Sequence, residues 1–228
     1  MKHNKISAIT NIQFIKNFKI SVIFLLGYAA VVAGVTGALT VLDVPLDAVY
    51  QVDTFVIASK VFLLLLGAIT FYSSFKDYIM QGVTRRDFVI GSLTAIAVLC
   101  LFYTLVLTGV YFVTHTMAGD TIDLYNTMLL LAVSLLLFYA YYIIGWFLGM
   151  AILKYRLIGR FICFVFAIIS VGLMEITTNI GFSHVVGGAD IIEPLSIPLV
   201  YNLLSTVIIS FLVTYYVYSK AKKIYIRV

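Results

Sequence analysis

The chain has few of the charged residues with which a water-soluble domain covers its surface. Only 11% of its 228 residues are charged, 63% are hydrophobic, and the mean hydropathy is +1.10. This composition argues strongly against a soluble fold and indicates a membrane protein. The two cysteines, Cys100 and Cys163, stand in apolar runs and form neither a disulfide framework nor a metal-ligand pattern.

Motifs for catalysis and nucleotide binding are also missing. The sequence contains no G-x-x-x-x-G-K-(S/T), so it has no phosphate-binding loop for ATP. His3, His115 and His184 are scattered without partners at metal-ligand spacing, and Ser183 lacks the G-x-S-x-G context of a hydrolase. The sequence therefore predicts neither an enzyme nor a bound cofactor or metal in this chain.

The few basic residues are confined to four segments. Fourteen of the fifteen Lys and Arg residues lie in 1–19, 76–86, 154–160 and 220–227, and eight of the ten acidic residues lie in the alternate segments. Because positive charge resists translocation, we expect the basic segments and both termini to be cytoplasmic. The net charge of +5 then reflects membrane topology, and we expect no nucleic acid partner.

Six apolar stretches connect these segments, and each approaches or exceeds the roughly 20 residues that cross the hydrocarbon core of a bilayer as a helix. The predicted fold is an all-α membrane protein with six transmembrane helices, in contact with lipid and multi-pass in a cell membrane. Residues 1–228 form one transmembrane domain, with spans at about 19–42, 55–75, 88–114, 127–153, 161–178 and 199–219.

Three segments leave alternatives open. Residues 1–18 mix lysines with apolar residues, which is typical of an amphipathic helix at the inner interface but also of a disordered basic tail on anionic lipid. The first apolar run is too long for a signal peptide, although cleavage after Ala38 would leave five spans. Segment 179–198 contains glycines and prolines, so it is either an outer loop or a pair of short re-entrant pieces.

The segment between spans two and three has the most specific local pattern. Gly82 suits a helix C-terminus because glycine adopts the left-handed conformation at low cost. Thr84 followed by Asp87 forms a capping box at the start of a new helix. We therefore expect one helix to end near Gln81 and the next to begin at Thr84. On these residues alone, the segment is a tight helical hairpin with topology-setting arginines, Arg85 and Arg86.

The sequence Gly82-Val83-Thr84-Arg85-Arg86-Asp87-Phe88 resembles the G-(V/M)-(S/T)-R-(K/R)-(D/E)-F signature of ABC-2-type permeases of Gram-positive bacteria. The layout of the whole chain is similar as well, with a short basic start, six spans and a broken outer loop before the last span. Within this family it looks most like the permeases that export phenol-soluble modulins and antimicrobial peptides. The resemblance implies half of an exporter in a bacterial cell membrane, moving a hydrophobic or amphipathic substrate outward.

The resemblance also implies partners and roles. ATP and Mg²⁺ would be bound by a separate cytoplasmic ATPase subunit, and a second permease copy, identical or paired, would complete the pore. Residues 1–18 would be the connecting helix, 179–198 the outer re-entrant region, and about 74–81 the coupling helix that docks onto the ATPase. The implied coupling residues are Tyr78, Ile79, Met80, Gln81, Gly82, Thr84, Arg85, Arg86 and Asp87.

Polar and aromatic residues inside the spans are further candidates. Lys60 and Glu175 lie at comparable depth in the outer leaflet, where they form an ion pair, a gate or a substrate contact, or reach the headgroups independently. Tyr139, Tyr142 and Trp146 share one face of span four, which lines a path for a peptide or packs against other helices.

Small residues at four-residue spacing allow close approach of helices. Gly145-x-x-x-Gly149 and Ala30-x-x-x-Gly34-x-x-x-Ala38 are two such stripes, and either could be a dimer seam.

Two other classes of function compete with the exporter. One is a membrane immunity or binding protein that holds a peptide without a transport cycle. The other is an ATP-independent carrier or channel, governed by Lys60 and Glu175. Small drugs and lipids are alternative substrates.

Overall fold

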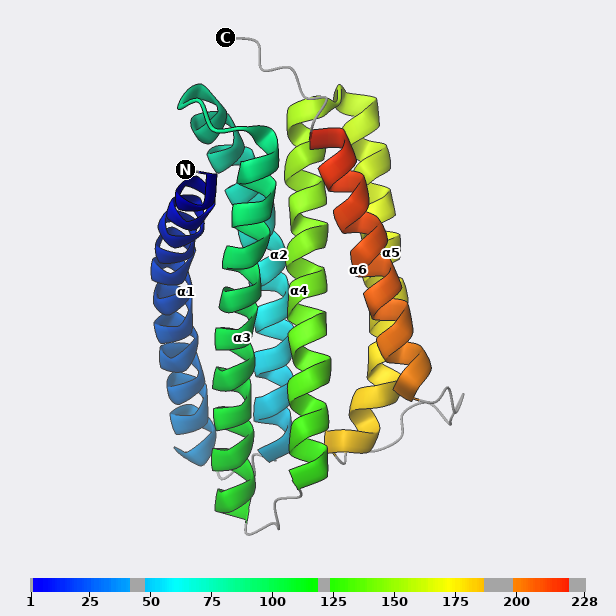
Figure 1. The fold of residues 1–228 in the computed structure, drawn as a ribbon. Coiled ribbons are helices and arrows are strands. Elements are labelled where there is room, and N and C mark those ends of the chain that lie inside the picture. The colour runs from blue at the N-terminus through cyan, green and yellow to red at the C-terminus, as the bar shows by residue number, and fades with distance from the viewer. Residues whose placement is uncertain (1, 42–47, 119–123, 187–198, 222–228) are drawn as a thin grey trace.

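The computed structural model describes residues 2–41, 48–118, 124–186 and 199–221, and within them it contains helices and no strand (Figure 1). The all-α prediction is therefore confirmed for the described chain. The helices are α1 (Lys2–Val41), α2 (Ala48–Met80), α3 (Arg85–Ala118), α4 (Leu124–Lys154), α5 (Leu157–Val186) and α6 (Leu199–Ala221).

Five of these helices contain stretches long and apolar enough to cross a membrane, which indicates a multi-pass membrane protein. In α6 the described apolar stretch, Leu204–Lys220, is shorter than in the other five. The spanning stretches are Ile6–Thr36, Val52–Met80, Arg85–Thr116, Thr127–Lys154 and Leu157–Glu175.

The helices run alternately in opposite directions. The start of α1, the α2–α3 turn, the α4–α5 connection and the end of α6 lie together at one end of the bundle, at the top of Figure 1. This end, which we call the basic end, gathers the described parts of the four segments that contain most of the lysines and arginines.

The helix α4 is central, since it contacts α2, α3, α5 and α6. Glycines bring α4 and α2 together: a Cβ atom at Gly145 would lie 2.0 Å from the Leu64 carbonyl oxygen, and one at Gly149 would lie 2.5 Å from that of Ala68. The small-residue stripe on α4 is thus used inside the chain, and the expectation that it forms a dimer seam is wrong. Gly34, in the other stripe, has no such neighbour within 4 Å.

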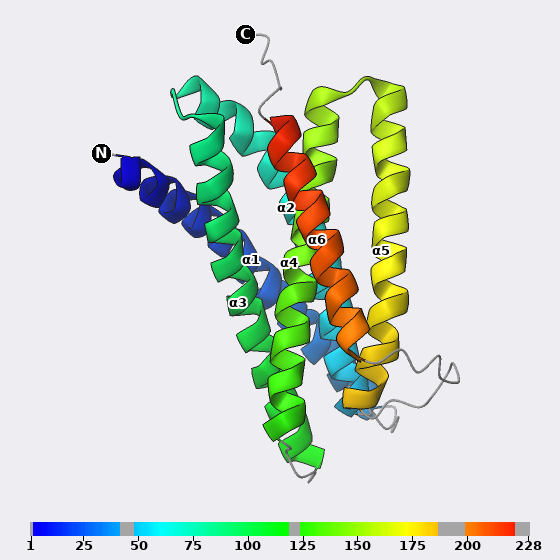
Figure 2. The same cartoon turned by 45° about the vertical axis from the view of Figure 1, so that its right-hand side comes forward.

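The helix α1 lies at the edge of the bundle and crosses α3 obliquely (Figure 2). It is unbroken across residues 18 and 19, so the N-terminal segment and the first span form one helix. Its buried side chains recur every four residues, at Ile9, Gln13, Asn17 and Ser21. A helix with one narrow buried stripe presents its remaining faces to lipid or to the membrane interface.

Several helices extend beyond the spans drawn from the sequence. The helix α5 passes through Gly181 and ends at Val186, so the structure makes 179–186 helix rather than loop. The rest of the proposed re-entrant region, 187–198, lies outside the described residues. The charged residues Arg85–Asp87 begin α3, because a helix can continue past the hydrocarbon where water satisfies its polar side chains.

Candidate functional site

The α2–α3 turn is closed by backbone hydrogen bonds. Gly82 has φ +77°, the left-handed conformation that glycine adopts readily. The Val83 N–H donates to the Tyr78 carbonyl at 3.1 Å, and the Gly82 N–H donates to the Ile79 carbonyl at 3.1 Å. These two bonds define a Schellman motif, which provides hydrogen-bond donors for carbonyls at the end of α2 that have no partner within the helix.

The next helix begins with the threonine that the sequence indicated. The Asp87 N–H donates to Thr84 Oγ1 at 3.2 Å, and the Phe88 N–H donates to the Thr84 carbonyl at 2.9 Å. Thr84 is therefore the N-cap of α3, as the capping-box pattern predicts.

Aromatic packing fixes this turn to the bundle. Phe75 and Phe88 are fully buried, and their ring centroids lie 5.4 Å apart. Phe88 also stacks on Trp146 of α4, with 6.0 Å between the ring centroids. The ring of Tyr78 packs against that of Phe88, with 5.5 Å between the ring centroids. The turn therefore moves with the core of the bundle and not as a loose loop.

The residues expected to contact a partner divide into two groups. Met80 is 57% exposed, whereas Tyr78 and Ile79 are half-buried and pack on the hydrophobic core. Met80 is thus the best-placed apolar contact of the turn. Of the other coupling residues, the exposed ones are Gln81, Gly82, Thr84 and Arg86, and the half-buried ones are Arg85 and Asp87.

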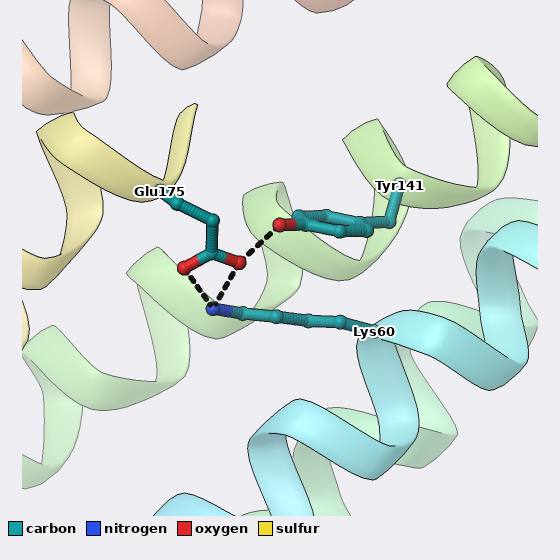
Figure 3. A network of polar contacts seen from close by, with 3 residues as sticks. All are labelled: Lys60, Tyr141 and Glu175. Atoms are coloured by element: carbon teal, nitrogen blue, oxygen red, sulfur yellow. Dashed lines mark hydrogen bonds and ion pairs between the residues drawn. The ribbon is translucent and has the colours of Figure 1, made fainter. Parts of the chain in front are cut away.

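A second cluster joins three helices (Figure 3). The Lys60 Nζ atom on α2 lies 2.9 Å from Oε1 and 3.1 Å from Oε2 of Glu175 on α5. The Tyr141 hydroxyl on α4 donates to Glu175 Oε1, and the Lys60 ammonium also lies 5.7 Å from the Tyr141 ring centroid. The structure shows the two side chains paired, so the alternative that they reach the headgroups independently is wrong.

The cluster lies far from the basic end. Lys60 precedes Met80 by twenty residues, or about 30 Å of helix, and Glu175 follows Leu157 by eighteen, or about 27 Å. Asp53, two helical turns before Lys60, also interacts electrostatically with it.

The two charges differ in their access to solvent. The Lys60 side chain is 8% exposed and that of Glu175 is 34% exposed. Taking an ion out of water costs several kcal/mol, so a lysine this enclosed requires a close carboxylate. The arrangement can hold α2, α4 and α5 together and can exchange one partner for a charged group of a ligand.

The remaining aromatic candidates are inside the bundle. Tyr142 and Trp146 are 0% and 1% exposed, and the Tyr142 hydroxyl accepts a hydrogen bond from Asn17 Nδ2 at 3.1 Å. Tyr139 is half-buried. A path lined by Tyr142 and Trp146 would require the surrounding helices to separate.

The polar stripe of α1 was not predicted from the sequence. Asn17 Oδ1 accepts from Thr70 Oγ1 of α2 at 3.2 Å, Gln13 Oε1 accepts from Ser92 of α3, and Thr10 Oγ1 donates to the Gly91 carbonyl at 3.0 Å. The four-residue spacing of Gln13 and Asn17 is a signal that was present in the sequence.

The comparisons with known proteins found no match among protein-family models, curated proteins or solved structures. The described residues contain no group of three or more His, Cys, Asp or Glu side chains placed to hold a metal ion. The ABC-2-type assignment of segment 82–88 therefore stays a prediction.

Proposed function

We propose that this chain is the permease subunit of an ABC-2-type exporter, which moves a hydrophobic or amphipathic peptide outward. A separate cytoplasmic ATPase subunit binds ATP and Mg²⁺ and drives the movement. The observation that carries the proposal is the α2–α3 turn, which is capped on both sides, packed onto the core through Phe88 and presents Met80 at the surface.

The turn is joined to the ion pair by a single helix. The helix α2 is unbroken from Ala48 to Met80, so it carries both Met80 at the basic end and Lys60 about 30 Å away. A packed helix moves as a rigid body, and force applied by a partner at Met80 reaches Lys60.

In this proposal the ion pair serves as an outer gate. Lys60 belongs to α2, whereas Glu175 belongs to α5 and Tyr141 to α4, so displacement of α2 against α5 separates the two charges. Closure of the ATPase dimer would shift α2, break the contact and open a cavity outward. Return of α2 would restore the pair and reset the permease.

The proposed topology has six crossings of a bacterial cell membrane, with both termini cytoplasmic. The helix α6 supports the sixth crossing, since its 23 residues pack beside α4 and α5. The basic end supports the orientation, because it combines the α2–α3 turn with the α4–α5 connection. Six crossings form half of a pore, which implies a second permease, identical or paired.

Site-directed crosslinking tests the docking turn. The native cysteines, Cys100 and Cys163, are buried, so a cysteine introduced by Met80→Cys is the accessible thiol for a photoactivatable maleimide. We expect the crosslinker to capture an ATP-binding subunit in membranes of the native host. The matched control is Arg156→Cys, which is also exposed at the basic end but lies in the other turn. Equal capture at both positions, or no ATPase at either, would refute the proposal.

The Lys60–Glu175 pair also favours a second candidate, an ATP-independent carrier. Ionisable pairs inside membrane proteins often mark transport pathways. Reconstitution in liposomes separates the two candidates: transport of a labelled amphipathic peptide by the chain alone, lost in Glu175→Gln, would support the carrier. Transport that requires an added ATPase and ATP would support the exporter.

A further inference from the structure

An apolar groove of about 710 Å³ opens on the flank of the bundle near the basic end. Ala68 of α2 and Ala151 of α4 contribute small side chains, and Phe161 and Phe164 of α5 contribute large ones. Its volume lies within the roughly 300–1,000 Å³ of small-molecule sites. Figure 2 shows α5 running apart from α4 near this end.

One lining residue is charged. Apart from Arg160, all the side chains along the groove are apolar. The Arg160 Nε group donates to the Tyr155 carbonyl at 2.9 Å, which anchors the guanidinium beside the α4–α5 connection. Because the surface of the groove is almost wholly apolar, Arg160 lines it with its aliphatic stem, and its guanidinium lies beside the groove at the Tyr155 carbonyl. An apolar groove with a cation beside it matches an amphiphile with an anionic head.

Further positive charge gathers around Arg160. Lys154 and Arg156 belong to the same α4–α5 connection. The Lys220 Nζ atom of α6 lies 5.5 Å from the ring centroid of Tyr216, and the Tyr216 and Tyr155 hydroxyls are hydrogen-bonded at 2.9 Å. The sequence contains no Asp or Glu between residues 124 and 174 or after 193. No acidic residue of these segments neutralises the cluster.

The tyrosine in this cluster adds no negative charge. Burial and the hydrogen bond with Tyr216 raise the pKa of Tyr155 to about 12, so its phenol is neutral at physiological pH. Tyr155 therefore does not reduce the positive charge of Arg156 and Arg160.

We infer that this groove binds an anionic glycerophospholipid, with one acyl chain between α4 and α5 and the phosphate on Arg156 and Arg160. The groove extends along α5 from Leu157 to Phe164, a distance of seven residues or about 10 Å, so part of an acyl chain can lie along it. A transmembrane helix would fill an apolar groove equally well but would leave Arg160 without a counter-charge. Basic pockets between helices at a membrane surface bind lipid headgroups in this way.

Fluorescence quenching in nanodiscs tests the inference with the full chain. The variant Phe161→Trp places an indole at the groove, where Phe161 is 68% exposed, and the native Trp146 is buried and gives a constant background. Discs of phosphatidylcholine receive small equal fractions of brominated phosphatidylglycerol or brominated phosphatidylcholine. The control Leu105→Trp sits on α3 at a position 57% exposed, outside the groove.

We expect brominated phosphatidylglycerol to quench Phe161→Trp several-fold more efficiently than brominated phosphatidylcholine, and Leu105→Trp to show no preference. Adding Arg156→Gln and Arg160→Gln should reduce the apparent affinity for phosphatidylglycerol by roughly fivefold per arginine. A preference that survives both substitutions, or the same preference at both tryptophans, would overturn the inference. Equal quenching by the two lipids at Phe161→Trp would also overturn it.

Discussion

The Lys60–Glu175 pair predicts an asymmetric response to mutation. Glu175→Gln leaves the Lys60 ammonium, 8% exposed, without its counter-ion, and a stranded buried charge costs about 3–5 kcal/mol. Lys60→Met leaves a carboxylate that is 34% exposed and keeps the Tyr141 hydrogen bond, so we expect a smaller loss of about 1–3 kcal/mol. The double variant removes both charges of the pair, leaves only the Asp53 carboxylate without its interaction with Lys60, and should lose only about 1 kcal/mol.

The assay is the free energy of unfolding of each variant in the same bicelles, combined as a double-mutant cycle. The losses expected for the single variants sum to about 4–8 kcal/mol, and the double variant should lose about 1 kcal/mol, which gives a coupling energy of at least about 3 kcal/mol. Tyr141→Phe removes one hydrogen bond and should cost about 1 kcal/mol. Lys76→Met, an exposed charge at the basic end, serves as the control and should change stability by less than about 0.5 kcal/mol.

Additivity would refute this reasoning. If the two single losses sum to the double loss within about 0.5 kcal/mol, the side chains do not interact, and the proposed gate loses its structural basis. A larger loss for Lys60→Met than for Glu175→Gln would show that the enclosed charge is not the lysine.

Four substitutions test the helix contacts and the turn. Gly145→Ala should lower thermal stability by about 1–3 kcal/mol, because its Cβ would lie 2.0 Å from the Leu64 carbonyl oxygen. Gly34→Ala, with no such neighbour within 4 Å, should be neutral or stabilising by up to about 1 kcal/mol, and equal losses would contradict the assigned α2–α4 contact. Gly82→Ala should cost about 1–2 kcal/mol because φ is +77°, and faster hydrogen exchange at the turn amides would report it. Thr84→Ala should cost about 1 kcal/mol in the same exchange measurement, and unchanged rates would argue against the cap.

The α2–α3 turn was predictable because its determinants are local. The Gly82 bond to Ile79 and the Asp87 bond to Thr84 each join groups three residues apart, so the order of residues fixes them. In the part of the chain that the structure describes, the number of helices and the grouping of basic residues at one end also followed from the local pattern of hydropathy and charge.

The cluster around Glu175 was only partly predictable. Lys60 and Glu175 are 115 residues apart, and helices that are apolar on all sides give little indication of which face meets which neighbour. Tyr141 stands between Tyr139 and Tyr142 in the sequence, and nothing local distinguishes the one that faces Glu175. Only the packing of α2, α4 and α5 assigns that role.

The polar stripe of α1 has a consequence for biosynthesis. Asn17 is translated first, whereas its partner Tyr142 follows 125 residues later. Until α4 is inserted, the Asn17 amide stands in the bilayer without this hydrogen bond, and an unsatisfied polar group there costs several kcal/mol. We therefore expect α1 to associate with an insertase or chaperone until α4 arrives. A chain truncated before Tyr142 should be degraded faster than one truncated after Lys154, which makes α4 the quality-control checkpoint of assembly.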